Sequence, residues 1–347
     1  MEEKNACAIS SWYPRYRTWT IPTTLIPLSS EFVQFLIDDG VTTPSDPSCS
    51  PWTPSLYSAM ESALDKYCKE VFIKLNWSAP RDGKWILGSM KCINIEDILL
   101  LLQSSDFIVH DICHAYDHCH NENEKDHCEK TNEDVKPLDQ TLAIRSWTSN
   151  LRSSLEFRCF ISNDSILGIS QRSDTVHAFL RPLLPELFYK IVTFLQKVFS
   201  KKPFQCDPFV VDVALQEPNY DGLLMDFNVW HSSTDGGTFA WTELESRRET
   251  NQGLSFSEIS KWNKKEENCH LYLKNNSDVF RILSSNAPSD SLQASNLHGY
   301  RVPLDFHLEA LHTPEGMAKF LDQVTLSSAQ DTLVSKWNNA ENCNLGK

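Results

Sequence analysis

The sequence lacks the surplus of positive charge that nucleic-acid-binding proteins use. Its 32 lysines and arginines are outnumbered by 46 aspartates and glutamates, which gives a net charge of −14. Proteins that bind polyanions concentrate Lys and Arg to neutralise phosphates, so this balance argues against direct nucleic-acid binding. It favours basic protein surfaces as partners.

The chain also lacks the runs that mark membrane and secreted proteins. No stretch approaches the roughly 18 apolar residues of a membrane helix, and the first residues, "MEEKNACAISSWYPRY", have neither a basic nor an apolar leader segment. The eleven cysteines are odd in number and scattered, which favours reduced thiols over a disulfide framework. We therefore expect a cytosolic or nuclear protein with no membrane partner. Of the two locations, we predict the cytoplasm.

Two common phosphate-binding motifs are missing as well. There is no Walker A glycine loop and no G-x-G-x-x-G, so neither a P-loop nor a Rossmann fold can carry a nucleotide site here. Hairpins and helices are interleaved without the regular spacing of βαβ units, which predicts an α+β protein. Its 347 residues suit one large or two closely packed domains.

Hydrophobic spacing and capping residues place the main elements. The expected elements are a helix over 55–71 leading into a strand at 71–75, a helix over 95–107 capped by Asn94 with Asp97, a polar loop over about 111–140, a hairpin at 156–172, a helix at 185–199, a hairpin at 209–230, little structure over 247–299 and a last helix starting at Thr313-Pro314-Glu315.

The hairpin "FVVDVALQEPNYDGLLMDFNVW" is acidic on one face. Side chains alternate along a strand, so Val211, Val213 and Leu215 share a core face, as do Leu223, Met225 and Phe227 on the return strand. The opposite parity carries Asp212, Asp226 and Asn228, and a turn near Asn219 sets Asp212 across from Asp226. Opposed carboxylates repel, and Mg²⁺, which prefers oxygen ligands, would stabilise them. The alternative is a solvated polar face.

Cations recur in other strand-like segments. Lys74 stands between apolar residues in "VFIKLNW", where its ammonium is poorly solvated unless an anion lies beside it. In "EFRCFISNDSILGISQR", Arg158 shares a strand face with Glu156, and Arg172 closes the return strand. Each arginine alone could be a surface residue. Together with Lys74 they suit a phosphate that also contacts a metal held by the aspartates.

Short motifs in order along most of the chain resemble a known family. These are "SWYP" (11–14), "LIDDG" (36–40), "KLNWSAPRD" (74–82), "SSDFI" (104–108), "RSW" (145–147), "EFRCF" (156–160), "GISQR" (168–172), "DFN" (226–228), "AWTELE" (240–245) and "YRVPLDF" (300–306). The sequence resembles the cell division cycle protein 123 (D123) family, a eukaryotic branch of the ATP-grasp fold.

The resemblance implies an α+β ATP-grasp fold in which two α+β lobes hold a nucleotide cleft between them. We expect the first lobe within 1–150, the second within 151–250 and a C-terminal extension over 251–347. It also implies ATP and Mg²⁺ as cofactors, and a chaperone role. The family assembles eukaryotic translation initiation factor 2 (eIF2) by binding its gamma subunit, which supports translation initiation and cell cycle progression.

The resemblance assigns roles to matching positions. It implies that Lys74 contacts the phosphates, that Asp106 belongs to the surface gripping the gamma subunit, and that Asp212, Asp226 and Asn228 hold Mg²⁺. The other implied ligand contacts are a loop over the nucleotide (Trp77, Ala79, Arg81), a hinge near the adenine (Arg145, Ser146, Trp147) and the cleft wall (Arg158, Gln171, Arg172).

Three departures from the family pattern bear on these roles. Asn228 is followed by Val229-Trp230-His231 where relatives have Pro, an aromatic and Gly, so a different exit loop is expected. Ser146 stands where relatives often have Lys, which predicts weaker nucleotide binding. The neutral loop from Thr42 to Ser55 replaces a long acidic insertion.

One segment suggests a different metal. Eight His and Cys residues crowd the stretch 110–128: His110, Cys113, His114, His118, Cys119, His120, His127 and Cys128. They could bind Zn²⁺, but no C-x-x-C pair occurs and few apolar residues surround them, which favours a polar loop.

Three functions remain open at this point. The chain is an ATP-dependent assembly chaperone for eIF2, an ATP-grasp ligase that forms an acylphosphate, or a diverged scaffold that no longer needs nucleotide. The fold alone does not decide among them, because function depends on the site. The family resemblance favours the chaperone, and hydrolysis of ATP stays undecided.

Overall fold

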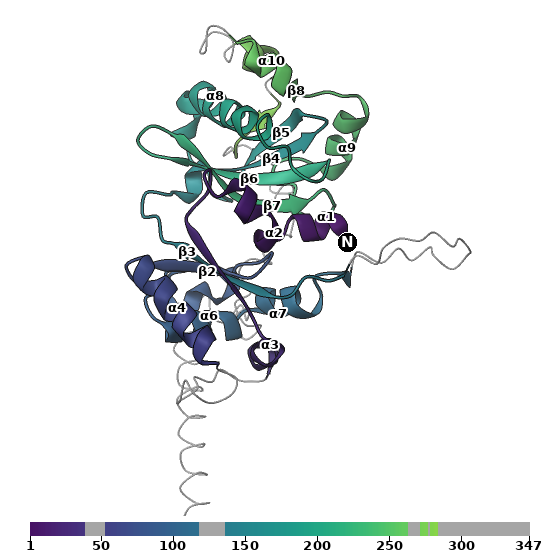
Figure 1. Cartoon of the computed structure of the whole chain (residues 1–347). Helices are drawn as coiled ribbons and strands as arrows, with labels where there is room; N and C mark the ends of the chain where they lie inside the picture. The colour runs from purple at the N-terminus through teal and green to yellow at the C-terminus, as the bar shows by residue number, and fades with distance from the viewer. Residues whose placement is uncertain (39–52, 118–135, 263–270, 277, 284–347) are drawn as a thin grey trace, which may run out of the picture. The chain divides into compact units, whose positions relative to one another are not determined.

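Two β-sheets, each covered by helices, form the part of the chain that the computed structural model describes: residues 1–38, 53–117, 136–262, 271–276 and 278–283 (Figure 1). All of these residues belong to one compact unit. The helices are α1 (Glu2–Ala6), α2 (Ile9–Tyr16), α3 (Ser30–Ile37), α4 (Pro54–Lys66), α5 (Lys84–Leu87), α6 (Ile95–Gln103), α7 (Asp106–Cys113), α8 (Leu180–Phe199), α9 (Trp241–Glu249) and α10 (Phe256–Ser260). The strands are β1 (Thr23–Pro27), β2 (Val71–Lys74), β3 (Thr141–Ser146), β4 (Glu156–Ser162), β5 (Ser165–Gln171), β6 (Phe209–Gln216), β7 (Asp221–Val229), β8 (Leu254–Ser255) and β9 (Phe280–Arg281). The predicted α+β class is confirmed.

The smaller sheet is antiparallel, in the order β1-β3-β2. Apolar side chains of α3, α4 and α6 join it in one core, and Asn94 caps α6 by accepting the Asp97 N–H at 2.8 Å, as predicted. The helix predicted to run to Val71 ends at Lys66 instead. Cys68 and Lys69 have positive φ angles, which no α-helix continues through, so the chain turns there and enters β2.

The larger sheet has the order β7-β6-β4-β5-β8, with β9 parallel to β5. The two predicted hairpins and the helix between them are confirmed as β4-β5, α8 and β6-β7. α8 lies along this sheet (Figure 1) and begins at Leu180 rather than 185. Its core also takes Trp12 and Tyr16 from α2.

The β6-β7 hairpin has the predicted register at its charged pair, because Asp212 lies opposite Asp226. One part of the parity prediction is wrong. A β-bulge between Asp212 and Val213 leaves Met225 as the extra residue, so Leu224 is buried in the core, whereas Leu223 and Met225, predicted for that face, are only partly buried and lie outside it. Met225 and Asp226 then both line the pocket described below.

The C-terminal part of the described chain has more structure than the sequence predicted. α10, β8 and β9 lie in the stretch 247–299, where little structure was expected. The predicted helix at Thr313, the motif at 300–306 and most of the loop 42–55 lie outside the described residues, and the domain boundaries at 150 and 250 stay predictions. Among the residues that the structure describes, no helix combines the length and apolar character needed to cross a membrane.

Gly222 of the β6-β7 hairpin lies directly against the Phe194 ring of α8. A Cβ atom at this position would clash with the ring of Phe194. We expect Gly222→Ala to lower the free energy of unfolding by about 1–3 kcal/mol, the usual cost of overpacking, measured by urea denaturation. Asp221→Ala, at the exposed neighbouring residue, is the control, and equal stability of the two variants would contradict the packing described here.

Candidate functional site

A pocket of about 270 Å³ lies between the two sheets. Most of the site residues predicted from the sequence line this pocket. Its lining residues are Phe72, Lys74, Trp77, Ser78, Ala79, Arg81, Phe107, Arg145, Glu156, Arg158, Arg172, Asp212, Met225, Asp226 and Asn228. The expectation of a cleft between two α+β lobes is therefore confirmed.

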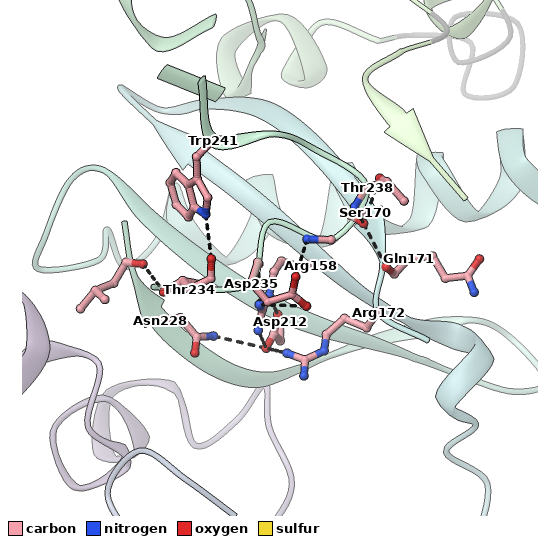
Figure 2. A network of polar contacts seen from close by, with 12 residues as sticks. Arg158, Ser170, Gln171, Arg172, Asp212, Asn228, Thr234, Asp235, Thr238 and Trp241 are labelled. Atoms are coloured by element: carbon pink, nitrogen blue, oxygen red, sulfur yellow. Dashed lines mark hydrogen bonds and ion pairs between the residues drawn. The ribbon is translucent and has the colours of Figure 1, made fainter. Parts of the chain in front are cut away.

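Asp212 is the buried centre of the polar network in Figure 2. Its carboxylate accepts hydrogen bonds from Arg158 at 2.8 and 2.9 Å, from Arg172, and from Asn228 at 3.3 Å. Burial alone would raise the pKa of Asp212, but Arg158 and Arg172 outweigh burial and hold that pKa well below its usual range. Asp212 is therefore an anion with strong cationic partners.

Lys74 and Asp226 form a second ion pair across the pocket. Lys74 Nζ lies 2.5 Å from Asp226 Oδ2, and this lysine, placed on the pocket side of β2, is almost fully buried. Burial lowers the pKa of Lys74, although Asp226 opposes that effect. The other carboxylate oxygen, Asp226 Oδ1, is buried and accepts no hydrogen bond from any described residue.

Arg145 extends the cationic side of the pocket from β3. It donates to the Met225 carbonyl at 3.0 Å and to Thr20 Oγ1 at 2.9 Å, so it links the bulge to the segment after α2. Its Nε is buried and has no hydrogen-bond partner among the described residues. Burial lowers the pKa of Arg145, which shows how poorly this guanidinium is solvated.

The pocket carries an excess of positive charge. Five lysines and arginines line it against three carboxylates, a surplus of two positive charges. Burial also raises the pKa of Glu156, although Arg172 and Arg81 oppose that effect. A surplus of cations in a pocket is stabilised by an anion with several negative charges.

The acidic residues fit a magnesium ion in their chemistry. Asp212, Asp226 and Asn228 offer hard oxygen ligands. Of these oxygens, Asp226 Oδ1 has no hydrogen-bond donor in the described chain. The part of the chain that the structure describes holds no group of three or more His, Cys, Asp or Glu side chains that could bind a metal by themselves, and the three residues named here would supply only part of a coordination shell. Mg²⁺ commonly completes such a shell with phosphates and water.

Four of the residues assigned by resemblance do not line the pocket. Ser146 pairs with Val71 at the end of β3, the central strand of the smaller sheet, and the Trp147 N–H donates to the Glu70 carbonyl at 2.9 Å. The Gln171 side chain donates to the Ser173 and Thr175 carbonyls. Asp106 is an exposed residue at the start of α7. The roles predicted for these four stay predictions.

Five lining residues were not assigned in advance: Phe72, Ser78, Phe107, Glu156 and Met225. The sequence could have indicated two of them, because Phe72 shares a strand face with Lys74 and Glu156 shares one with Arg158. Ser78 lies inside the "KLNWSAPRD" motif. The bulge hid Met225, and Phe107 reaches the pocket from a separate helix.

The departures from the family pattern leave the pocket largely intact. The exit loop after Asn228 buries Trp230, whose indole donates to Glu245 at 2.7 Å. Five of the eight clustered His and Cys residues (His118, Cys119, His120, His127 and Cys128) lie outside the described residues, so the zinc alternative stays untested. The cysteines that the structure describes are free thiols.

Asp212 should make stability depend on pH. Its pKa in the folded protein is lower than the value of about 3.9 for an unfolded aspartate. Its contribution is therefore present above about pH 4 and is lost as the pH falls through the folded-state pKa. We expect Asp212→Asn to lower the free energy of unfolding by about 3–5 kcal/mol at neutral pH.

Urea unfolding between pH 7 and pH 3 measures this effect. The difference between the natural protein and Asp212→Asn should shrink as the pH falls from 5 toward 3. Asp221→Asn, at an exposed carboxylate of β7, is the matched control. A difference that stays constant over the whole range would contradict the prediction.

The sequence and the structure are similar to those of several other eukaryotic proteins. The translation initiation factor eIF2 assembly protein of Botryotinia fuckeliana is 35% identical over 268 residues, 69% of this chain and 63% of that protein. The protein of the same name from Emericella nidulans is 30% identical, over 91% of this chain and 88% of its own length. The chain thus spans less than two thirds of the Botryotinia relative.

A solved structure agrees with these relatives. Cdc123 from Schizosaccharomyces pombe superposes with a TM-score of 0.61 at 31% identity, over 73% of this chain and 95% of that chain. The model of the D123 family matches residues 46–309, more than half of the sequence. The predicted resemblance is confirmed, and the protein belongs to the D123 family.

Proposed function

We propose that this protein binds ATP with Mg²⁺ in the pocket between its sheets and acts as an assembly chaperone for eIF2. One observation supports the ligand most directly. Two more positive than negative side chains line the pocket, and it also holds a carboxylate oxygen, Asp226 Oδ1, without a partner in the described chain. A polyanion that carries a divalent cation matches both features.

The charges divide between the two parts of this ligand. Lys74, Arg158 and Arg172 would hold phosphate oxygens, while Asp212, Asp226 and Asn228 would hold Mg²⁺. When bound, the ion would neutralise charge on the phosphates. The loop with Trp77, Ala79 and Arg81 would cover the nucleotide. This is the arrangement expected of an ATP-grasp cleft.

The Lys74–Asp226 pair makes ATP and Mg²⁺ depend on each other. Buried Lys74 and half-buried Asp226 neutralise each other at 2.5 Å. Lys74 can turn to a phosphate only if another cation compensates Asp226, and the reverse holds for the carboxylate. We therefore expect ATP and Mg²⁺ to bind together far more tightly than either alone.

The chaperone role comes from the family. Relatives that are named eIF2 assembly proteins align with this chain at 30–35% identity. We propose that this protein likewise assists eIF2 assembly, with the gamma subunit as its direct partner and Asp106 on the contact surface. A location in the cytoplasm, where translation takes place, and a link to cell cycle progression belong to the same proposal.

Asp226→Asn tests the nucleotide site. Asparagine keeps the shape and one acceptor oxygen for Lys74 but removes the charge. We expect Mg-ATP to bind at least about tenfold more weakly, a loss of about 1.4 kcal/mol or more, and the melting temperature to fall as well, because buried Lys74 loses its counter-charge. Calorimetric titration of the purified full-length protein measures the affinity.

Asp221→Asn, an exposed change on the same strand, should bind Mg-ATP as the natural protein does. If Asp226→Asn left both Mg-ATP binding and eIF2 assembly unchanged, the scaffold alternative would be favoured. Release of ADP or AMP in step with a small-molecule acceptor would favour the ligase.

Asp106→Lys tests the partner surface. Reversing a charge in a complementary interface weakens binding, so we expect the affinity for purified eIF2 gamma subunit to fall at least about tenfold. Asp117→Lys makes the same charge change at an exposed residue just beyond α7 and serves as the control. Equal binding by both variants would remove Asp106 from the surface.

A further inference from the structure

Asp111, on α7, is a buried carboxylate that holds the backbone of the loop after β2. Its side chain is 1% exposed. Its Oδ2 accepts the N–H groups of Trp77 at 3.1 Å and Ser78 at 2.6 Å, and its Oδ1 accepts the Ser78 hydroxyl at 2.7 Å. One side chain thus satisfies three donors of two consecutive residues.

The segment held in this way forms one wall of the pocket. Trp77, Ser78, Ala79 and Arg81 all line it, directly after Lys74 at the end of β2. The chain turns tightly there, since the Leu75 N–H donates to the Ser78 carbonyl at 2.9 Å. The position of this wall relative to Lys74 therefore depends on what fixes residues 77 and 78.

A second carboxylate ties the same segment to the start of α7. Asp82, also buried, accepts the Ser105 hydroxyl at 2.5 Å and the Phe107 N–H at 3.3 Å. Ser105 is the N-cap of α7, and Phe107 lines the pocket. Residues 77–82 are thus linked to both ends of one helix.

α7 itself is anchored beyond this loop. The Gln140 amide donates to the Asp111 carbonyl at 2.9 Å, just before β3 begins. The loop is therefore linked to the smaller sheet through α7, and it is also tied to the N-terminal segment, because the Trp77 indole donates to the Lys4 carbonyl at 2.8 Å. Few other routes give residues 77 and 78 backbone partners, because N–H groups in a turn have no strand neighbour to pair with.

We propose that Asp111 is a positioning residue for the anionic ligand of the pocket. It holds residues 77–79 in the form that closes the pocket beside Lys74, and Asp82 holds the other end of the same wall against Ser105. Asp111 acts through hydrogen bonds and does not touch the ligand. This inference rests on the proposed Mg-ATP site and adds a residue that keeps that site in its binding form.

Two substitutions separate hydrogen bonding from charge. In Asp111→Asn, the amide oxygen can accept both N–H groups and the amide nitrogen can donate to the Ser78 hydroxyl, so all three contacts persist. Asp111→Leu keeps the volume but removes every acceptor. If the binding form of the loop falls to about a tenth of the molecules, the apparent affinity falls about tenfold.

The experiment measures Mg-ATP affinity by calorimetric titration and amide hydrogen exchange at residues 77 and 78 in the full chain. We expect Asp111→Leu to weaken Mg-ATP binding about tenfold and to speed exchange at both amides. Asp111→Asn should remain within about threefold of the natural protein in both measurements. Asp117→Ala, at an exposed carboxylate after the same helix, should change neither.

Ser78→Ala is the milder variant and decides the matter if Asp111→Leu does not fold. It removes one of the three contacts, and we expect faster exchange at residue 78 with a smaller loss of affinity. Unchanged affinity and exchange in the folded Asp111→Leu or Ser78→Ala variant would overturn the inference. Behaviour of Asp111→Asn like that of Asp111→Leu would also overturn it, because charge would then be the cause.

The exchange measurement separates this inference from the proposed function. If the natural protein fails to bind Mg-ATP, the proposed function is wrong. Loss of protection in Asp111→Leu would still support Asp111 as the residue that fixes the loop, and unchanged protection would overturn that role too.

Discussion

One carboxylate, that of Asp212, collects polar side chains from four neighbouring strands or their ends. Arg158 comes from β4, Arg172 follows β5, Asp212 itself lies on β6 and Asn228 on β7. A buried carboxylate is costly unless several donors surround it. The order and register of the larger sheet are therefore tied to this charge arrangement, and the face opposite it is free to pack against α8.

Much of the site could be predicted because strand residues alternate between two faces. The sequence placed Arg158 and Asp212 on polar faces of two separate hairpins, and the structure pairs these residues directly across β4 and β6. It also marked Lys74 as a cation that needs an anion, and Lys74 does lie beside a carboxylate. The anion supplied by the chain is Asp226, which the sequence had assigned to a metal. Composition and parity reveal charged faces, whereas the pairing of charges follows from how the strands assemble.

The rest depends on irregular geometry and on distant partners. The bulge at Met225 breaks the alternation, and nothing in the residue types announces it. Ser146 and Gln171 match family motifs, but their contacts are with nearby backbone groups and not with the pocket. β8 and β9 have two residues each, too few to show a period. Asp111 stood in a tract read as a polar loop, because its partners lie 33 and 34 residues away.

The path of the chain through the two sheets has one more consequence. α2 packs into the core of the larger sheet, and Thr20 bonds to the Leu224 carbonyl, 204 residues further on. In the sequence, the strands of the smaller sheet therefore all lie between α2 and the strands of the larger sheet, whose core α2 joins. During synthesis Trp12 and Tyr16 leave the ribosome long before β6 and β7 have been made. The core of the larger sheet can therefore form only late. Until β6 and β7 have been made, the apolar side chains of α2 lack the strands that bury them.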